Sequence, residues 1–281
     1  MEQGFNSHIG YMTGSQWCPS GALEGWKYDQ VVDELKGTNS VLRFPGGTIS
    51  RTYGYQSADI HYFNKLCRDT GSKVTFVVNM NDIQNSINTS KLIESEIVLY
   101  EAGNEEYDYT RAPIGWEWLM VLFNIKGWYR RLGQEYGRKY LQVKNGLSGA
   151  PVAACINIPN DNKNTAWLQG VQDVVDLKDI VVHRYYNPGD VDFFDSLDKH
   201  LHKLDRYNIY YTELNCKWRP GEYQEVAYTD NHKQLLSSYI SYLKDRPNTM
   251  MILVHSLWGH YLFSRYIVDG NQVIDMYKDW Y

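Results

Sequence analysis

The chain has 281 residues, of which 43% are hydrophobic and 22% are charged, and its formal net charge is −5. That length buries a large core in one barrel-sized domain or in two small domains. The acidic balance and the lack of a basic run exclude nucleic acid as an expected partner. No stretch reaches the roughly 18 apolar residues of a membrane span, and the N-terminus has no charged-then-apolar leader pattern. The localisation stays open between a cytosolic protein and a mature chain that is secreted, surface-associated or virion-associated.

Aromatic residues are unusually frequent, at 15%, with 24 Tyr and 9 Trp. They fill cores, and they also line sugar-binding clefts, because each ring offers a flat apolar face and, in Tyr and Trp, a polar edge. Composition alone favours core filling. The cysteines Cys18, Cys67, Cys155 and Cys216 form no C-x-x-C pair, so no zinc knuckle or redox motif is indicated. We expect no metal and no cofactor.

Short runs rich in Val, Ile and Tyr recur along the chain. They are continuous rather than alternating, which is typical of parallel strands buried on both faces. The predicted strands are residues 4–11, 40–44, 73–80, 96–103, 151–158, 179–186, 208–215 and 250–258.

Amphipathic segments separate these runs. The predicted helices are residues 29–36, 58–71, 116–137, 164–175, 191–205 and 231–245. Strand–helix alternation indicates βαβ units, and eight strands in this length favour an α/β fold of the (β/α)₈ TIM-barrel type over an open sheet. No linker or repeat divides the chain, so residues 1–281 are predicted to form a single domain.

Two segments depart from the barrel pattern. Residues 81–95, NDIQNSINTSKLIES, are short and polar for a barrel helix. Residues 265–281 resemble a hairpin with a Gly-Asn turn and leave no room for an ordinary eighth helix. We therefore expect the eighth helix to be short, missing or replaced by a neighbouring chain.

The candidate chemistry lies at the predicted strand ends, because (β/α)₈ barrels carry their active sites at the C-terminal ends of the strands. Glu105 follows Asn104 at the end of the fourth strand, and Glu213 closes the seventh. These strands lie across the barrel mouth from each other, so we expect the two carboxylates to converge. Paired carboxylates suit glycosidic bond cleavage, in which one carries a proton and the other attacks or activates water.

These motifs resemble clan A of the glycoside hydrolases, which are retaining (β/α)₈ enzymes with catalytic glutamates on strands four and seven. LRFPGG at residues 42–47 is similar to the strand-two signature of arabinofuranosidase- and glucuronidase-like families. The resemblance spans residues 4–258. It rests on five motifs that are weak individually but occur in the expected order. The matching residues are Asn104 and Glu105 in GNE, Glu213 in TEL, His183 and Tyr185 in H-x-Y, and Trp258 on strand eight.

The resemblance implies a retaining glycoside hydrolase that cleaves a poly- or oligosaccharide by double displacement. Glu105 would be the general acid/base and Glu213 the nucleophile, with carboxyl groups roughly 5–5.5 Å apart. Arg43 and Tyr185 would bind the Glu213 carboxylate and keep it ionised for attack.

The resemblance also implies three contacts to a carbohydrate substrate. Asn104 would bind the 2-hydroxyl of the sugar, and this contact strengthens in the transition state. His183 would orient the sugar or the acid, and Trp258 would form a platform under the sugar at the cleavage point.

Each of these residues also has a structural interpretation. One alternative makes Glu105 and its neighbour Glu106 exposed loop acids. Another makes Arg43 and Glu213 an ion pair without a chemical role. His183 and Trp258 are also explained as core residues. Metal interpretations are weaker: the H-x-H pair His200 and His202 points in different directions on a helix, and Asp190, Asp192 and Asp195 lack the Gly and Glu of a calcium loop.

Two rival functions remain at the level of the sequence. One is a glycan-binding barrel without turnover, such as an adhesin or a receptor-binding protein. The other is a structural or virion subunit that reuses the fold, since a fold alone does not fix a function. The joint presence of both glutamates and Asn104 favours the enzyme.

Overall fold

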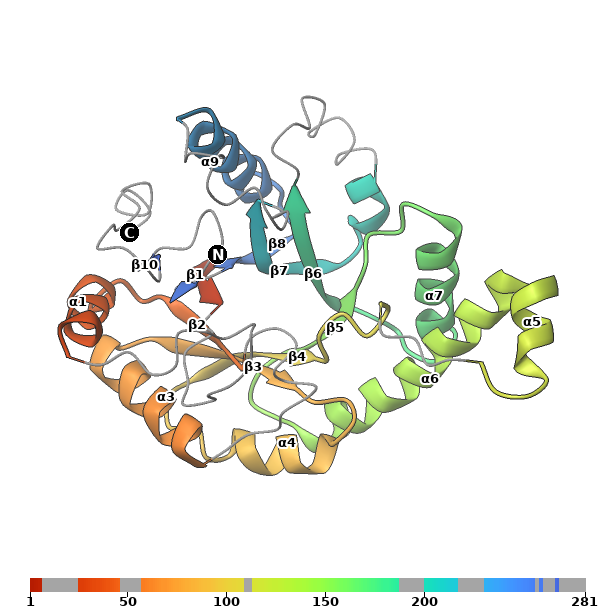
Figure 1. Cartoon of the computed structure of the whole chain (residues 1–281), viewed down its shortest axis with the longest axis horizontal. Coiled ribbons are helices and arrows are strands. Elements are labelled where there is room, and N and C mark those ends of the chain that lie inside the picture. Colours follow the sequence, from red (N-terminus) through yellow and green to blue (C-terminus); the bar gives the residue numbers. More distant parts are fainter. Residues whose placement is uncertain are drawn as a thin grey trace.

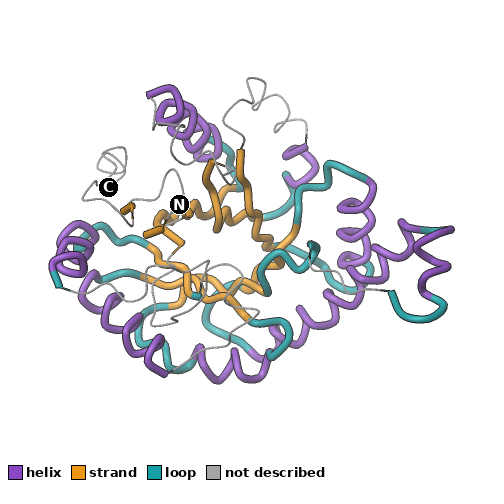
Figure 2. The backbone as a smooth tube through the Cα atoms, viewed as in Figure 1, coloured by secondary structure: helices purple, strands orange, loops and turns teal. Residues whose placement is uncertain are grey.

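The computed structural model describes residues 1–6, 25–45, 57–108, 113–186, 200–216, 230–255, 258–259 and 266–267. Eight parallel strands, paired in chain order, close into a barrel, and helices surround it (Figures 1 and 2). The predicted (β/α)₈ fold is therefore confirmed. The strands are β1 Glu2–Asn6, β2 Val41–Phe44, β3 Lys73–Val78, β4 Ile97–Ala102, β5 Val152–Ile156, β6 Asp179–Tyr186, β7 Asn208–Cys216 and β8 Thr249–His255.

The barrel strands are buried on both faces, as their continuous apolar sequences predict. Every residue of β2 and β5 is buried, and so are the last five residues of β3. Outward-facing side chains of the strands pack against the helices, as where Phe44 of β2 stacks on Phe63 with ring centroids 4.4 Å apart. The hydrophobic core therefore lies largely between the barrel and its helices, which leaves the interior free for polar side chains.

Most predicted helices are present, with shifted ends. The helices are α1 Trp26–Leu35, α3 Ser57–Thr70, α4 Ile83–Ser90, α5 Glu117–Phe123, α6 Ile125–Gly146, α7 Asn162–Gln172, the 3₁₀ turn η1 His202–Leu204, and α9 Asp230–Lys244. The short, polar segment after β3 does form a helix, α4, because the Asp82 side chain caps it by accepting a hydrogen bond from the Asn85 amide. Among the described residues, no helix is both long enough and apolar enough to cross a membrane.

The prediction of one helix over residues 116–137 is wrong. The structure has two helices there, and the second, α6, continues to Gly146. Asn124 separates them with φ −149° and ψ 66°, and its side chain accepts a hydrogen bond from the Gly127 amide. An asparagine that caps a helix start satisfies a free amide and interrupts the preceding turn.

Several predictions fall on residues outside the described part of the chain. They include residues 7–11 of the first strand, most of the helix over residues 191–205, and Asp190, Asp192 and Asp195. Apart from Tyr266 and Ile267, the C-terminal hairpin also falls there, and so does the question of an eighth helix. After β8, the described residues hold the two-residue strands β9 Trp258–Gly259 and β10 Tyr266–Ile267, which pair in parallel.

Candidate active site

Buried polar side chains gather inside the C-terminal end of the barrel. Arg43 of β2 and Glu101 of β4 are fully buried, and His183 of β6 and Glu213 of β7 are nearly so. A charged group is rarely buried unless it is paired. Their convergence from four strands therefore requires a network of ion pairs and hydrogen bonds.

Arg43 is the centre of that network. Its Nε and Nη2 atoms donate to the two oxygens of Glu101 at 2.7 and 2.6 Å. Its Nη1 atom donates to Oε1 of Glu213 at 2.5 Å, and Nη2 also donates to Oδ1 of Asn104 at 2.9 Å. One guanidinium group thus fixes the positions of two carboxylates and one amide, as its planar fork allows.

An extra residue in β7 turns Glu213 into the barrel. Tyr211 pairs with Val182 of β6, but the next pair is His183 with Glu213, so Thr212 has no partner in the register. Tyr211 faces α9, where Tyr239 and Tyr242 lie near it. Strict alternation would place Glu213 on this same outer face, two residues on. The bulge at Thr212 re-aims it toward Arg43 instead.

Two donors hold the Glu213 carboxylate. Arg43 binds Oε1, and the hydroxyl of Tyr185 donates to Oε2 at 2.6 Å. Tyr185 lies two residues after His183 in β6, so both side chains face the barrel interior. A cation and a hydroxyl donor both favour the ionised form of a carboxylate.

Glu105 stands on a tight turn after β4. Gly103 has φ 85° and Glu105 has φ 52°, a left-handed conformation that is uncommon for a residue other than glycine. A Cβ atom at Gly103 would lie 2.6 Å from Cγ of Glu106 and 2.7 Å from Cγ of Met80, so this position requires glycine. The strained backbone is held in place by its surroundings, as is common at functional sites.

Helix α6 supports this turn from outside the barrel. The Tyr136 hydroxyl donates to the carbonyl of Ala102 at 2.6 Å and accepts from the Cys155 amide at 2.9 Å. The Glu105 amide in turn donates to Sγ of Cys155 at 3.4 Å. The end of β4 is therefore joined to β5 at the point where Glu105 leaves the strand.

The two predicted catalytic carboxylates meet at the barrel mouth. One oxygen each of Glu105 and Glu213 and a ring nitrogen of His183 lie within 4.8 Å of one another. The side chain of Glu105 is 27% exposed, whereas that of Glu213 is 6% exposed. The first carboxylate therefore has access to solvent, while the second is enclosed by its donors.

His183 lies among three carboxylates. Its Nε2 atom is 3.0 Å from Oε1 of Glu101, and its Nδ1 atom is 3.2 Å from Oε1 of Glu105 and 3.7 Å from Oε2 of Glu213. Burial alone would lower the pKa of His183, but the charge of Glu213, the contact with Cys155 and the hydrogen bond to Glu101 raise that pKa well above its usual value. The raised pKa favours the protonated imidazole, which has a donor on each nitrogen.

Glu101 is the counter-charge of this cluster. Burial would raise the pKa of its carboxyl group, but the adjacent Arg43 and then the bond from His183 bring that pKa below its usual value. Glu101 is therefore ionised. Arg43 and His183 thus lie among the carboxylates of Glu101, Glu105 and Glu213.

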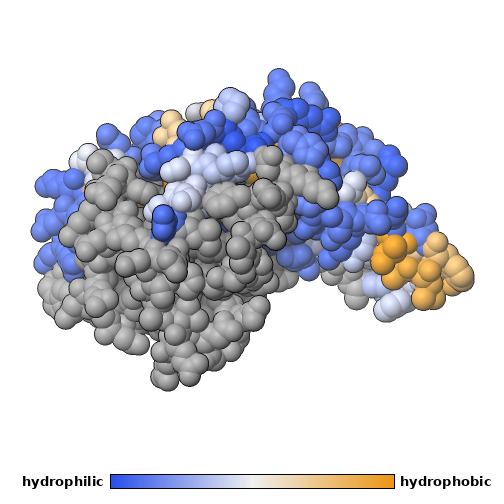
Figure 3. All heavy atoms as spheres, turned by 90° about the horizontal axis from the view of Figure 1, so that it is seen from above, coloured by the Kyte–Doolittle hydropathy of each residue, from blue (hydrophilic) through white to orange (hydrophobic). Residues whose placement is uncertain are grey.

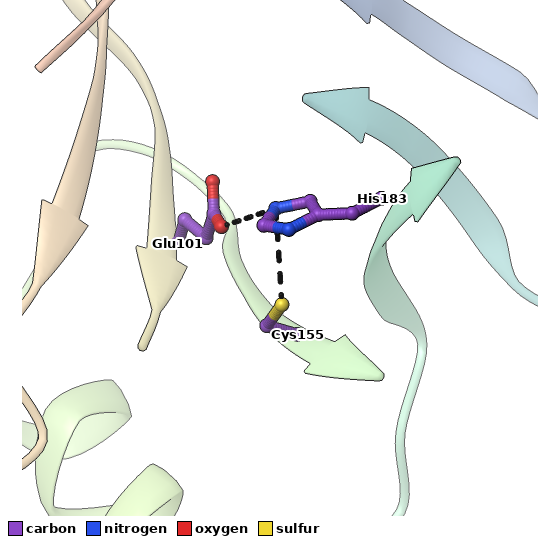
Figure 4. A group of neighbouring side chains, drawn as sticks. All are labelled: Glu101, Cys155 and His183. Carbon is purple, nitrogen blue, oxygen red and sulfur yellow. Dashed lines mark hydrogen bonds and ion pairs between the residues drawn. The ribbon is translucent and has the colours of Figure 1, made fainter. Parts of the chain in front are cut away.

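The site contains two sets of potential metal ligands, and neither set fits a metal ion well. Glu101 and Cys155 both face the His183 ring (Figure 4), and their ligand atoms lie within 4.8 Å of one another. Arg43 already occupies both oxygens of Glu101, and burial raises the pKa of the Cys155 thiol. In the second set, Glu105, His183 and Glu213, Arg43 and Tyr185 already occupy both oxygens of Glu213, and the raised pKa of His183 favours the protonated ring, which has no lone pair to give.

Six of the seven predicted site residues come together in the structure. Only the side chain of Trp258 lies outside the described part of the chain. Neither potential metal set contains His200 or His202, so the residues described here give the H-x-H pair no ligand group. The residues that converge are Arg43, Asn104, Glu105, His183, Tyr185 and Glu213.

Glu101 and Cys155 are the site residues that the sequence analysis missed. Both residues lie inside strands rather than just after them: Glu101 is the fifth of the six residues of β4, and Cys155 is the fourth of five in β5. A usable signal existed for Glu101: an acid inside an otherwise apolar strand must find a buried partner. No comparable signal in the sequence points to Cys155, because a buried thiol is ordinary.

No protein-family model matches the chain, and no curated protein matches it. Solved structures do match its fold. A GH51 arabinofuranosidase from Xanthomonas axonopodis pv. citri has a TM-score of 0.61 and 13% identity, and the match covers 96% of this chain and 69% of that chain. The α-L-arabinofuranosidase from Thermotoga maritima, in complex with arabinose, has a TM-score of 0.54 and 17% identity over 96% of this chain and 67% of that chain.

A third solved structure has a different activity in its name. The GH128 endo-β-1,3-glucanase from Amycolatopsis mediterranei, in complex with laminaritriose, has a TM-score of 0.53 and 12% identity, covering 91% of this chain and 88% of that chain. At these identities the likeness is one of fold. The resemblance to clan A glycoside hydrolases is thus confirmed at the level of the eight-stranded parallel barrel.

Proposed function

We propose that this chain is a retaining glycoside hydrolase that cleaves glycosidic bonds of a poly- or oligosaccharide, with Glu213 as nucleophile and Glu105 as general acid/base. The observation that carries the proposal is the convergence of their oxygens to within 4.8 Å at the barrel mouth. Retaining glycosidases hold their two carboxyl groups about 5–5.5 Å apart, whereas inverting ones hold them roughly 6.5–9.5 Å apart to admit a water molecule. The short separation supports retention.

In the first step, a Glu213 oxygen attacks the anomeric carbon while Glu105 gives its proton to the glycosidic oxygen. The bond between carbon and leaving oxygen breaks, and a glycosyl ester of Glu213 forms. In the second step, Glu105 takes a proton from water, which attacks the same carbon and releases Glu213. Arg43 and Tyr185 hold the Glu213 oxygens in place through both steps.

The different environments of the two carboxylates support this division of roles. Glu213 is 6% exposed and both of its oxygens are bound by Arg43 and Tyr185, as suits a nucleophile held in one position. The exposure of Glu105 also gives its proton a path to and from water.

Two further residues are proposed to bind the sugar. Arg43 occupies the carbonyl oxygen of Asn104, which leaves the amide NH₂ group on the opposite side to donate to a sugar hydroxyl. Trp258 is proposed as the platform under the sugar, as the sequence resemblance implies. Both contacts would orient the anomeric carbon toward Glu213.

A substrate screen with chemical labelling tests the proposal. The named activities of the fold neighbours suggest a panel that begins with α-L-arabinofuranosides and β-1,3-glucans, with products followed by mass spectrometry. A 2-fluoro glycoside of the active sugar should label the Glu213 peptide. Glu213→Gln should remove the label and lower kcat at least about 10³-fold.

Glu106→Gln is the matched control, because it changes an acid beside Glu105 that the proposal gives no role. This variant should keep kcat within about threefold of the parent. Labelling of another carboxylate, or inverted products by NMR, would refute the mechanism. Glycan binding without any product would instead support the rival barrel without turnover.

A further inference from the structure

Large apolar side chains are concentrated on one projecting part of the molecule. Of the ten large hydrophobic residues that are exposed among those described, seven lie between residues 114 and 125. Figure 3 shows the apolar surface at one end of the molecule, and Figure 1 shows α5 outside the ring of barrel helices. We call this group the α5 lobe: Ile114, Trp116, Trp118, Leu119, Leu122, Phe123 and Ile125, which are 52–84% exposed.

The lobe departs from the pattern of an ordinary surface helix. Helix α5 reads EWLMVLF and has no polar face, because its one acid, Glu117, is buried. A helix that is apolar all round is normally buried, and seven residues are too few to be stable without packing. Leu122 and Phe123 are nevertheless 72% and 84% exposed. Helix α5 is therefore formed although most of its apolar surface is exposed to solvent.

We propose that the α5 lobe is a dimer interface that pairs with the α5 lobe of a second copy of this chain. The exposed parts of three aromatic and four aliphatic side chains amount to on the order of 600–800 Å². A monomer rarely exposes an apolar patch larger than about 300–600 Å². A specific dimer buries about 800 Å² on each partner, which the lobe and its immediate surroundings supply.

The chemistry of the lobe favours a protein surface over a glycan. The Glu117 carboxylate accepts from the Ile114 amide at 2.9 Å and pairs with Arg131 at 3.1 Å. The Asn124 side chain is used to cap α6. The polar groups beside the tryptophans thus bond within the chain, whereas sugar recognition requires polar groups directed at the ligand.

The charge of the lobe also disfavours a lipid surface. Helices that lie on membranes carry several Lys and Arg residues on their polar face. Residues 113–126, PIGWEWLMVLFNIK, contain one Lys and one Glu, and the whole chain has a net charge of −5. A projecting apolar surface without net charge is complementary to a second copy of the same surface. Two copies of the chain related by a two-fold axis bring these surfaces together.

Analytical ultracentrifugation of the full chain tests this interface. The parent should sediment with about twice the monomer mass of 32.8 kDa at micromolar concentration. The double variant Leu122→Asp/Phe123→Asp should sediment as a monomer, with a dimer dissociation constant raised at least about 100-fold. The circular dichroism spectrum and the melting temperature of the double variant should match those of the parent chain diluted until it is monomeric. Both substituted side chains are exposed, so their replacement should leave the fold intact.

Leu92→Asp is the matched control, since Leu92 is 58% exposed but lies outside the lobe. This variant should remain a dimer. A parent chain that is monomeric at about 100 μM, or a double variant that still dimerises, would overturn the proposal. Flotation of a monomeric parent with phosphatidylcholine–phosphatidylserine vesicles would assign the lobe to a lipid surface and would also overturn it. The test does not depend on catalysis.

Discussion

Glu101 is the residue on which the charge balance of the candidate active site depends. It binds Arg43 through both oxygens and His183 through one, yet it stands behind Glu105 and Glu213 as a buried counter-ion. Its proposed role is to position the other charges, so its removal should change the pH dependence of catalysis as well as its rate.

Glu101→Gln tests this role. Without the Glu101 carboxylate, the pKa of His183 loses one of the contributions that raise it, so His183 should lose its proton at a lower pH. We expect the basic limb of the pH–kcat profile to move down by about 1 pH unit. Glu96→Gln, an exposed change just before β4, should leave the profile unchanged. An unmoved basic limb in Glu101→Gln would contradict this role of Glu101.

Glu105→Ala separates acid catalysis from nucleophilic attack. Only poor leaving groups need a proton, so aryl glycosides of acidic phenols should react within about tenfold of the parent rate. Natural glycosidic linkages should slow by about 10²–10⁴-fold. The measurement is kcat/KM across a series of aryl leaving groups. An equal loss for all leaving groups would exclude Glu105 as the proton donor.

At the scale of elements, β7 and the α6–α7 pair show how local geometry fixes the site. The extra residue Thr212 decides that Glu213 enters the barrel. Helix α6 carries Tyr136, which joins the ends of β4 and β5 beside Glu105. The position of α6 depends in turn on its close packing against α7.

Gly170→Ala tests that packing. A Cβ atom at Gly170 would lie 1.8 Å from the carbonyl oxygen of Arg130, so the two helices must separate to admit it. We expect a loss of about 2–3 kcal/mol in the free energy of unfolding, measured with urea. Gly137→Ala on the same helix pair, where the nearest atom is 3.2 Å away, should change it by less than about 1 kcal/mol. Equal effects would refute the close approach.

For the whole molecule, the buried charges predict how stability depends on pH. The pKa of Glu101 lies below its usual value of 4.5, so its contribution to stability is present above that pH and is lost on acidification. The pKa of His183 lies well above its usual value of 6.5, so its contribution is present below that pH and is lost as the pH rises. Glu101 and His183 therefore both contribute fully to the free energy of unfolding only between about pH 4.5 and 6.5.

Urea unfolding from pH 3 to 9 measures this profile. The parent should be most stable between about pH 4.5 and 6.5 with respect to these two groups. His183→Gln should show a smaller fall in unfolding free energy between pH 6.5 and 8.5 than the parent. A parent that gains stability over that interval relative to the variant would contradict the assigned direction of the His183 shift.

The sequence by itself determined the strand–helix alternation, the closed parallel barrel and six residues that converge on the site. It did so because buried parallel strands leave continuous apolar runs, and because their polar ends gather at one mouth. Only the tertiary structure decided that Glu213 faces inward, that Glu101 joins Arg43 and His183, and that the α5 lobe is uncovered. A bulge, a buried ion pair and an exposed surface are relations between distant segments, and no local pattern of residues encodes them.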